Sequence, residues 1–310
     1  MTAHQPEALI ASILERCPLV GLGEIHWCPQ VMMAITTLLE SPVLEEIFDD
    51  IVVEFGSARH QAWLDCYIRG DEVGEAGLDA VWQDTLYFLL WSPPVYAEFF
   101  RRIRAVNLKR APQQRVRVVL AEPAIDWETL DGKGFGRWHE AREQAYVELI
   151  EREVLDRGRR AILIFGLRHL THDSLPGAPH APLAERLGRR HPGMIELIHP
   201  YHAQKGVFSG DYPLPDVRHN GLIVAAAFDA SNGPAMIDHI WCLGVLERRI
   251  VLPDVLFTDT ARLATVVARL QQLGEEHLMR ARNMMTASQQ ALFDACLMRH
   301  VDGTPKGPSA

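Results

Sequence analysis

Four residues with acid–base side chains stand at the ends of apolar segments of this chain. They are Glu24, His26, Glu54 and His169. Histidine titrates near neutral pH and can accept or deliver a proton, and a carboxylate beside it can hold a water molecule. Glu54 directly follows the apolar run 51–53, where a carboxylate is costly to bury unless it is paired or bound. These four residues therefore predict a catalytic site built on acid–base chemistry.

Further polar residues follow the same apolar segments. Arg59 comes shortly after Glu54, and we predict that either Arg59 or Arg168 stabilises a developing oxyanion in the site. The alternative is a Glu54–Arg59 ion pair that only anchors a loop. Substrate contacts are predicted for Trp27, Glu122, Arg168 and His172.

The elements that must position these residues are short apolar segments that alternate with longer helical patterns. The predicted strands are rich in Val, Ile and Leu without polar alternation, as in a parallel sheet buried on both faces. They lie at 19–25, 51–55, 116–121, 161–165, 194–198 and 222–228, and helices are expected at 29–40, 58–69, 78–91, 95–108, 138–157 and within 258–298. The alternation predicts an α/β fold with a mostly parallel sheet and helices on both faces. Ligands of such folds bind beyond the carboxyl ends of the strands, where the four residues stand.

The chain of 310 residues is expected to form a single α/β domain over 1–301. A helical insertion at 71–109 is predicted to act as a lid over the site. The segment 209–220, which contains two prolines and a glycine, is predicted to be a flap. The tail at 302–310 is expected to be flexible because it is rich in Gly, Pro, Lys and Ser.

Composition argues against several classes of protein. The formal net charge of -9 disfavours a surface for nucleic acid or anionic membrane. The five cysteines are widely spaced and form no CxxC pair, so neither a disulfide framework nor a zinc ribbon is expected. We see no signal-peptide pattern and no apolar stretch of the ~18 residues that a membrane span needs. We therefore expect a cytoplasmic protein that acts on a small molecule, and the sequence does not set its oligomeric state.

The motifs Gly23-Glu24-Ile25-His26 and Gly166-Leu167-Arg168-His169, with Glu54 between them, resemble those of the erythromycin-esterase-like, ChaN-like and Tiki/TraB group. The resemblance covers about the first 170 residues. It implies that Glu24, His26, Glu54 and His169 occupy active-site positions, with Arg59 beside them. Members of the group include hydrolases of macrolide esters, metal-dependent peptidases and a haem-binding lipoprotein.

The sequence leaves three candidate functions open. The first is a hydrolase of a small ester or peptide-like substrate, in which His26 or His169 activates a water molecule held by Glu54 or Glu24. Two histidines and two glutamates are also ligand types for zinc or manganese, so a metal-dependent hydrolase stays open.

The second function, ranked below the first, is binding of haem or another ligand. Flat apolar contacts would then come from Trp27, Trp91, Tyr96 and Trp127, and a histidine or tyrosine would be the axial ligand. The third is a partner-binding protein without catalysis on the same fold.

Overall fold

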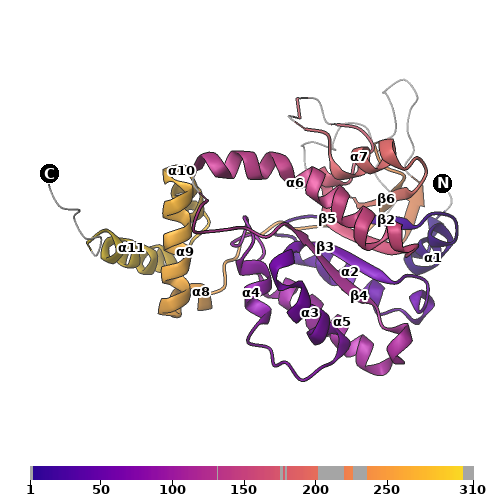
Figure 1. Ribbon diagram of the computed structural model, residues 1–310, viewed down its shortest axis with the longest axis horizontal. Coiled ribbons are helices and arrows are strands. Elements are labelled where there is room, and N and C mark those ends of the chain that lie inside the picture. Colours follow the sequence, from indigo (N-terminus) through magenta and orange to yellow (C-terminus); the bar gives the residue numbers. More distant parts are fainter. Residues whose placement is uncertain are drawn as a thin grey trace.

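The structure is a computed structural model of the chain (Figure 1). It describes residues 3–130, 132–174, 177, 178, 180–201, 220–225 and 236–302. The predicted flap at 209–220 and the predicted tail at 302–310 lie almost entirely outside these residues.

An eight-stranded sheet forms the centre of the molecule, in the order β1-β7-β8-β6-β2-β5-β3-β4. The neighbours from β8 to β4 pair in parallel, whereas β7 pairs antiparallel with β1 and β8. The mostly parallel sheet is therefore confirmed. The strands are β1 (Ala3–His4), β2 (Leu19–Glu24), β3 (Asp50–Ser57), β4 (Arg117–Glu122), β5 (Ala161–Gly166), β6 (Ile195–Pro200), β7 (Ile223–Ala225) and β8 (His239–Trp241).

The six predicted strands correspond to β2 to β7. The short strands β1 and β8 were not predicted, because two or three residues give no periodic signal. The segment predicted at 222–228 forms β7 in its described part, and its residues 226–228 lie outside the described residues.

Helices cover both faces of the sheet, as predicted (Figure 1). One apolar cluster joins one face to α1, α2 and α5, and another joins the opposite face to α6 and α7. The layers follow from the order of the strands. Because β5 lies between β2 and β3, the connection from β2 to β3 must pass over β5 on one face of the sheet. The helices of the two layers are α1 (Pro6–Arg16), α2 (Pro29–Leu39), α3 (Gln61–Arg69), α4 (Leu78–Gln83) and α5 (Pro94–Lys109) on one side, and α6 (Gly132–Glu153) and α7 (Leu183–Arg190) on the other.

The predicted insertion at 71–109 is helical, and most of it belongs to the core. Phe99 and Phe100 of α5 are fully buried and pack on Phe55 of β3, with ring centroids 5.2 and 5.6 Å away. Between α4 and α5, Tyr87 and Leu90 line a pocket described below. The stretch between α4 and α5 therefore borders the pocket, and closure of the insertion as a lid stays a prediction.

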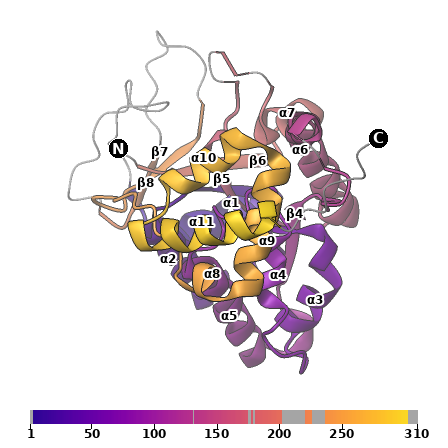
Figure 2. The ribbon, with the colours of Figure 1, turned by 90° about the vertical axis from the view of Figure 1, so that its left-hand side faces the viewer.

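The C-terminal helices lie in front of the sheet in Figure 2. They form their own apolar cluster, in which Phe257, Val267 and Phe293 are almost fully buried, and Trp27 and Phe88 join it from the N-terminal half of the chain. The helices therefore pack against the loop that follows β2. They are α8 (Val255–Thr258), α9 (Thr260–Leu273), α10 (Glu275–Asn283) and α11 (Ala287–Asp302).

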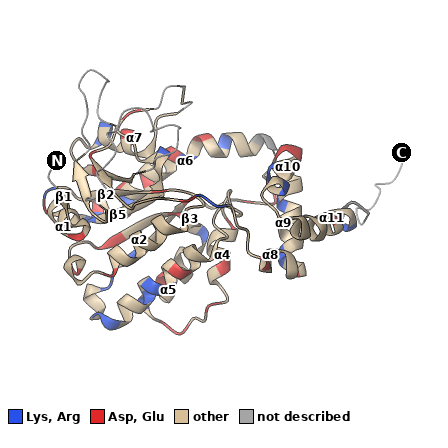
Figure 3. Cartoon of the chain, turned by 180° about the vertical axis from the view of Figure 1, so that it is seen from behind, with Lys and Arg blue, Asp and Glu red and all other residues tan. Residues whose placement is uncertain are grey.

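Acidic and basic side chains are interspersed over the helices (Figure 3). None of the described helices has the length and apolarity that a membrane crossing requires.

Candidate active site

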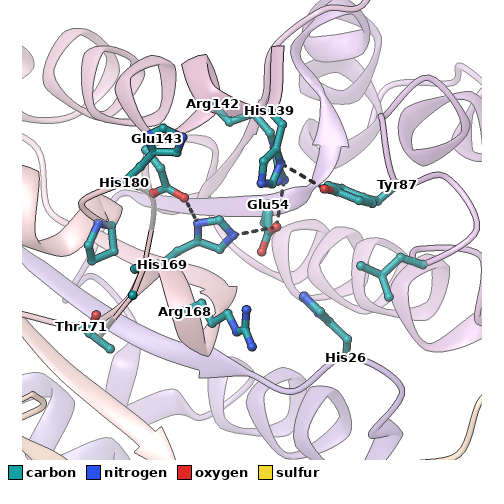
Figure 4. A pocket seen from close by; sticks show the side chains of 14 residues that line it. His26, Glu54, Tyr87, His139, Arg142, Glu143, Arg168, His169, Thr171 and His180 are labelled. Carbon is teal, nitrogen blue, oxygen red and sulfur yellow. Dashed lines mark hydrogen bonds and ion pairs between the residues drawn. The ribbon is translucent and has the colours of Figure 1, made fainter. Parts of the chain in front are cut away.

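A pocket of about 620 Å³ opens beyond the carboxyl ends of β3 and β5 (Figure 4). Four of the residues predicted from the sequence line it: His26, Glu54, Arg168 and His169. They come from β3 and from the loops after β2 and β5, so the parallel strands bring together residues far apart in the chain. The other described lining residues are Tyr87, Leu90, His139, Arg142, Glu143, Thr171, Gly177, Ala178, His180 and Pro182.

Glu24 and His26 form a carboxylate–imidazole pair. Glu24 follows Leu22 on the face of β2 that packs on α5, and its side chain is only 2% exposed. Its Oε2 lies 2.5 Å from Nδ1 of His26, and its Oε1 accepts a hydrogen bond of 2.8 Å from the hydroxyl of Tyr96. The ring of Trp91 packs edge-on against His26 at 4.9 Å. These contacts fix the imidazole and leave its Nε2 for the pocket.

Gly166 lies between the His26 ring and the Glu54 carboxylate. A Cβ at this position would lie 2.8 Å from Cε1 and 2.9 Å from Nε2 of His26, and 3.3 Å from Oε2 of Glu54. Glycine is thus required here for close approach rather than for backbone shape, since its φ of -55° suits any residue.

The pKa of His26 reflects opposing effects. Burial lowers the pKa, but the charge of Glu24 and its hydrogen bond raise it by more, so the net pKa is above 6.5. The side chain is 30% exposed, which gives the pocket access to the ring.

Glu54 lies on the opposite face of the sheet, toward α6. It is 2% exposed and stands where the pairing of β3 with β4 shifts register between Val53 and Ser57. Its Oε1 lies 3.0 Å from Arg142 and 3.2 Å from Nε2 of His169, and its Oε2 accepts a bond of 2.8 Å from the backbone N–H of Gly166. Burial raises the pKa of Glu54, but the charges of His169 and Arg142 outweigh burial and lower it strongly.

His169 is held between two carboxylates. Its Nδ1 lies 2.5 Å from Oε1 of Glu143, and its Nε2 faces Glu54. Burial lowers the pKa of His169, but the charges of Glu54 and Glu143 raise it to about 10. His169 is therefore an imidazolium at neutral pH that donates both N–H groups, and it has no free nitrogen with which to act as a base.

Arg142 connects the carboxylates behind the pocket. Its guanidinium is 3% exposed and bonds Oε2 of Glu122 at 2.9 and 3.1 Å as well as Glu54. The Tyr146 hydroxyl donates to the same Glu122 oxygen at 2.5 Å. Burial raises the pKa of Glu122, and the charge of Arg142 opposes that rise. Glu122, predicted to contact substrate, is fully buried and is absent from the described lining of the pocket.

Glu24, which pairs with His26, and three further predicted residues are also absent from that described lining. Arg59 donates to the carbonyl of Ile125, and Arg142 takes the place beside Glu54 that the ion-pair alternative gave to Arg59. His172 lies 2.7 Å from Asp238. Trp27 packs in the cluster of the C-terminal helices. Their roles in catalysis or substrate binding stay predictions.

Sequence reasoning missed Arg142 and Glu143, both on α6. The buried stripe of this helix runs through Arg142, Tyr146 and Ile150, so the arginine shares a face with apolar residues. An arginine spaced four residues from a tyrosine and eight from an isoleucine was the available signal, because such residues share a helix face.

The described donor groups do not form a metal site, and His169 does not fit haem. Among the described residues, no group of three or more His, Cys, Asp and Glu side chains is arranged to hold a metal ion. Both nitrogens of His169 face carboxylates, so it cannot serve as an axial ligand.

No protein-family model and no curated protein matches the chain. Solved structures of similar fold include an erythromycin esterase mutant in its open conformation, with 14% identity, a TM-score of 0.48 and coverage of 64% of this chain and 77% of that one. They also include ChaN of Campylobacter jejuni with cofacially bound haem (10% identity, TM-score 0.44, coverage 65% and 88%) and a protein of Bacillus cereus (11%, 0.43, 61% and 67%). Erythromycin esterase and ChaN are also named in the resemblance that the sequence motifs carry.

Proposed function

We propose that the protein is a hydrolase of small ester or peptide-like substrates in which His26 is the general base. One observation carries the proposal. His26 is oriented by Glu24 through Nδ1, and its Nε2 remains for a pocket that also contains the guanidinium of Arg168. Arg168 has no hydrogen-bond or ion-pair partner among the described residues, so its charge is available to a ligand.

The arrangement supports a simple sequence of steps. His26 takes a proton from a water molecule, whose oxygen forms a bond to the substrate carbonyl carbon. Glu24 holds the imidazole in the tautomer with the proton on Nδ1 and stabilises the imidazolium that forms. Arg168 stabilises the negative charge on the carbonyl oxygen. His26 then returns the proton to the leaving oxygen or nitrogen as its bond to the carbonyl carbon breaks.

A histidine paired with a carboxylate is not diagnostic in this protein. His60, His172, His191 and His239 also face carboxylates at 2.7–2.9 Å. None of these four is among the described residues that line the pocket. What distinguishes His26 is its position beside the pocket and Arg168, and the others serve as controls.

The test uses a screen of small esters and amides, followed by kinetics on the substrate found. We expect His26→Asn to lower kcat/KM by about 10²–10⁴-fold, because a positioned base contributes that much. Arg168→Gln should lower kcat by about 10²–10³-fold. His60→Asn, which removes a similar pair outside the pocket, should leave kcat/KM unchanged.

The pH profile separates a base from a structural histidine. Because only neutral His26 accepts a proton and its pKa is raised, kcat/KM should fall as the pH drops through a value above 6.5. Glu24→Gln removes the charge that raises this pKa, so the acid limb should move to lower pH. Full activity of His26→Asn, or an unmoved acid limb in Glu24→Gln, would contradict the mechanism.

A further inference from the structure

A second pocket, of about 410 Å³, lies beside the candidate active site. It shares no described lining residue with the first pocket, but Trp27 of its lining directly follows His26 in the chain, and Pro93 lies three residues after Leu90. Its volume falls within the range of about 300–1,000 Å³ that small-molecule sites occupy. Its described lining is Trp27, Cys28, Pro29, Pro93, Pro94, Val95, Tyr96, Arg249 and Val251.

The walls of this second pocket are preformed. Helices α2 and α5 begin there with Pro29 and Pro94, whose rings fix the backbone. Trp27 has a φ of 64°, in the left-handed region that residues other than glycine rarely adopt. Its indole is held by the cluster of C-terminal helices, and its carbonyl accepts a bond of 2.8 Å from the N–H of Arg249. A ligand would therefore meet a rigid apolar surface.

Arg249 is the only charged residue among the nine that line this pocket in the described part of the chain. It is exposed, and its guanidinium has no described hydrogen-bond or ion-pair partner. Apolar walls with one free cation complement a molecule that carries an apolar body and one negative charge. We propose that the second pocket binds a small amphipathic carboxylate, whose apolar body lies on Trp27 and Pro93 and whose carboxylate pairs with Arg249.

The occupant would be coupled to the candidate active site. Tyr96 forms part of the pocket wall, and its hydroxyl donates to the Glu24 carboxylate that orients His26. Trp27, another wall residue, directly follows His26. Binding should therefore change the environment of the His26 ring whether or not the protein is a hydrolase.

The test measures binding rather than turnover. Calorimetric titration of the full chain would compare 4-phenylbutyrate with its neutral amide, which has nearly the same shape. We expect the acid to bind about tenfold more tightly, as a hydrogen-bonded charge allows. Arg249→Gln should remove this preference, and Arg280→Gln, which alters an exposed arginine on α10, should keep it.

Two further variants locate the ligand. Val95→Trp should fill the second pocket and abolish binding of both compounds, whereas Arg168→Gln in the first pocket should leave binding unchanged. The Cε1–H resonance of His26 should shift when the acid binds. Equal affinities for acid and amide, no binding at millimolar concentration, or binding lost in Arg168→Gln but kept in Arg249→Gln would overturn the proposal.

Discussion

Three histidines that follow or end neighbouring strands differ in charge because of what surrounds them. Burial lowers the pKa of His199 to about 4, and its Nε2 donates to the carbonyl of Leu170 at 2.7 Å. Two carboxylates raise the pKa of His169 to about 10. His26 has one hydrogen-bonded carboxylate, Glu24, whose charge raises its pKa, and its ring is partly exposed, so it is suited to exchange a proton. The partners of each ring, rather than the residue type, decide which histidine can be a base.

At the residue scale, the charge of His169 predicts how stability depends on pH. Its pKa is 6.5 in the unfolded reference and about 10 in the folded protein, so the folded state binds the proton more tightly. The stabilisation is complete below pH 6.5 and is lost as the pH rises toward 10. The free energy of unfolding, measured by denaturant titration between pH 6 and 10, should therefore fall with rising pH.

In His169→Gln the free energy of unfolding should fall less steeply with rising pH. The unfolding free energy at pH 6.5 should drop by about 3–5 kcal/mol, because Glu54 and Glu143 lose a buried cation. His4→Gln, at an exposed position of β1, serves as the control and should keep the wild-type slope. A wild-type slope in His169→Gln would show that His169 is not the titrating group.

At the scale of elements, the position of β5 decides the site. Gly166 ends this strand opposite Glu24 of β2, while β3 lies on the other side of β5. The absence of a side chain there lets the His26 ring and the Glu54 carboxylate both approach the same backbone position. The site therefore depends on the insertion of β5 between β2 and β3.

Gly166→Ala tests this dependence. The added Cβ should displace the His26 ring at a cost of about 1–3 kcal/mol in stability. It should also lower kcat/KM by about 10²-fold, because displacing the His26 ring misplaces the base. The comparison is Gly188→Ala on α7, where a Cβ meets nothing within 4 Å and stability should rise by up to about 1 kcal/mol. Unchanged kinetics in Gly166→Ala would argue against His26 as the base.

At the scale of the whole molecule, the C-terminal helices are joined to the α/β part through shared apolar contacts. Trp27 follows the first strand of the site and packs in the same cluster as Phe257 and Phe293. Leu86, Ile125, Leu130 and Leu273 form a smaller cluster between the same two parts. These contacts suggest that the helices fold together with the sheet.

Phe293→Ala examines whether the two parts unfold together. Phe293 is fully buried on α11, and its truncation should cost about 3–5 kcal/mol. If the chain is one domain, circular dichroism and tryptophan fluorescence should report the same single transition at a lower denaturant concentration. The neighbouring Leu292→Ala, 44% exposed, should have little effect. Two separated transitions in Phe293→Ala would show that the C-terminal helices are a unit of their own.

The sequence by itself determined the strands of the parallel core and the polar residues that follow them. Apolar runs without alternation identify doubly buried strands from local information alone, and Glu24, His26, Glu54 and His169 stand directly at their ends. Parallel pairing of the strands then brings these four residues to the same edge of the sheet.

Only the tertiary structure decided which strands are neighbours and which partners each side chain has. Strand order is a non-local property, so no local pattern places Gly166 between His26 and Glu54. Likewise, Arg142 and Glu143 read as ordinary charges on an amphipathic helix until α6 packs on the sheet and buries them beside Glu54 and His169. Those contacts fix the charge of His169, and the pairing of His26 with Glu24 leaves His26 as the candidate base.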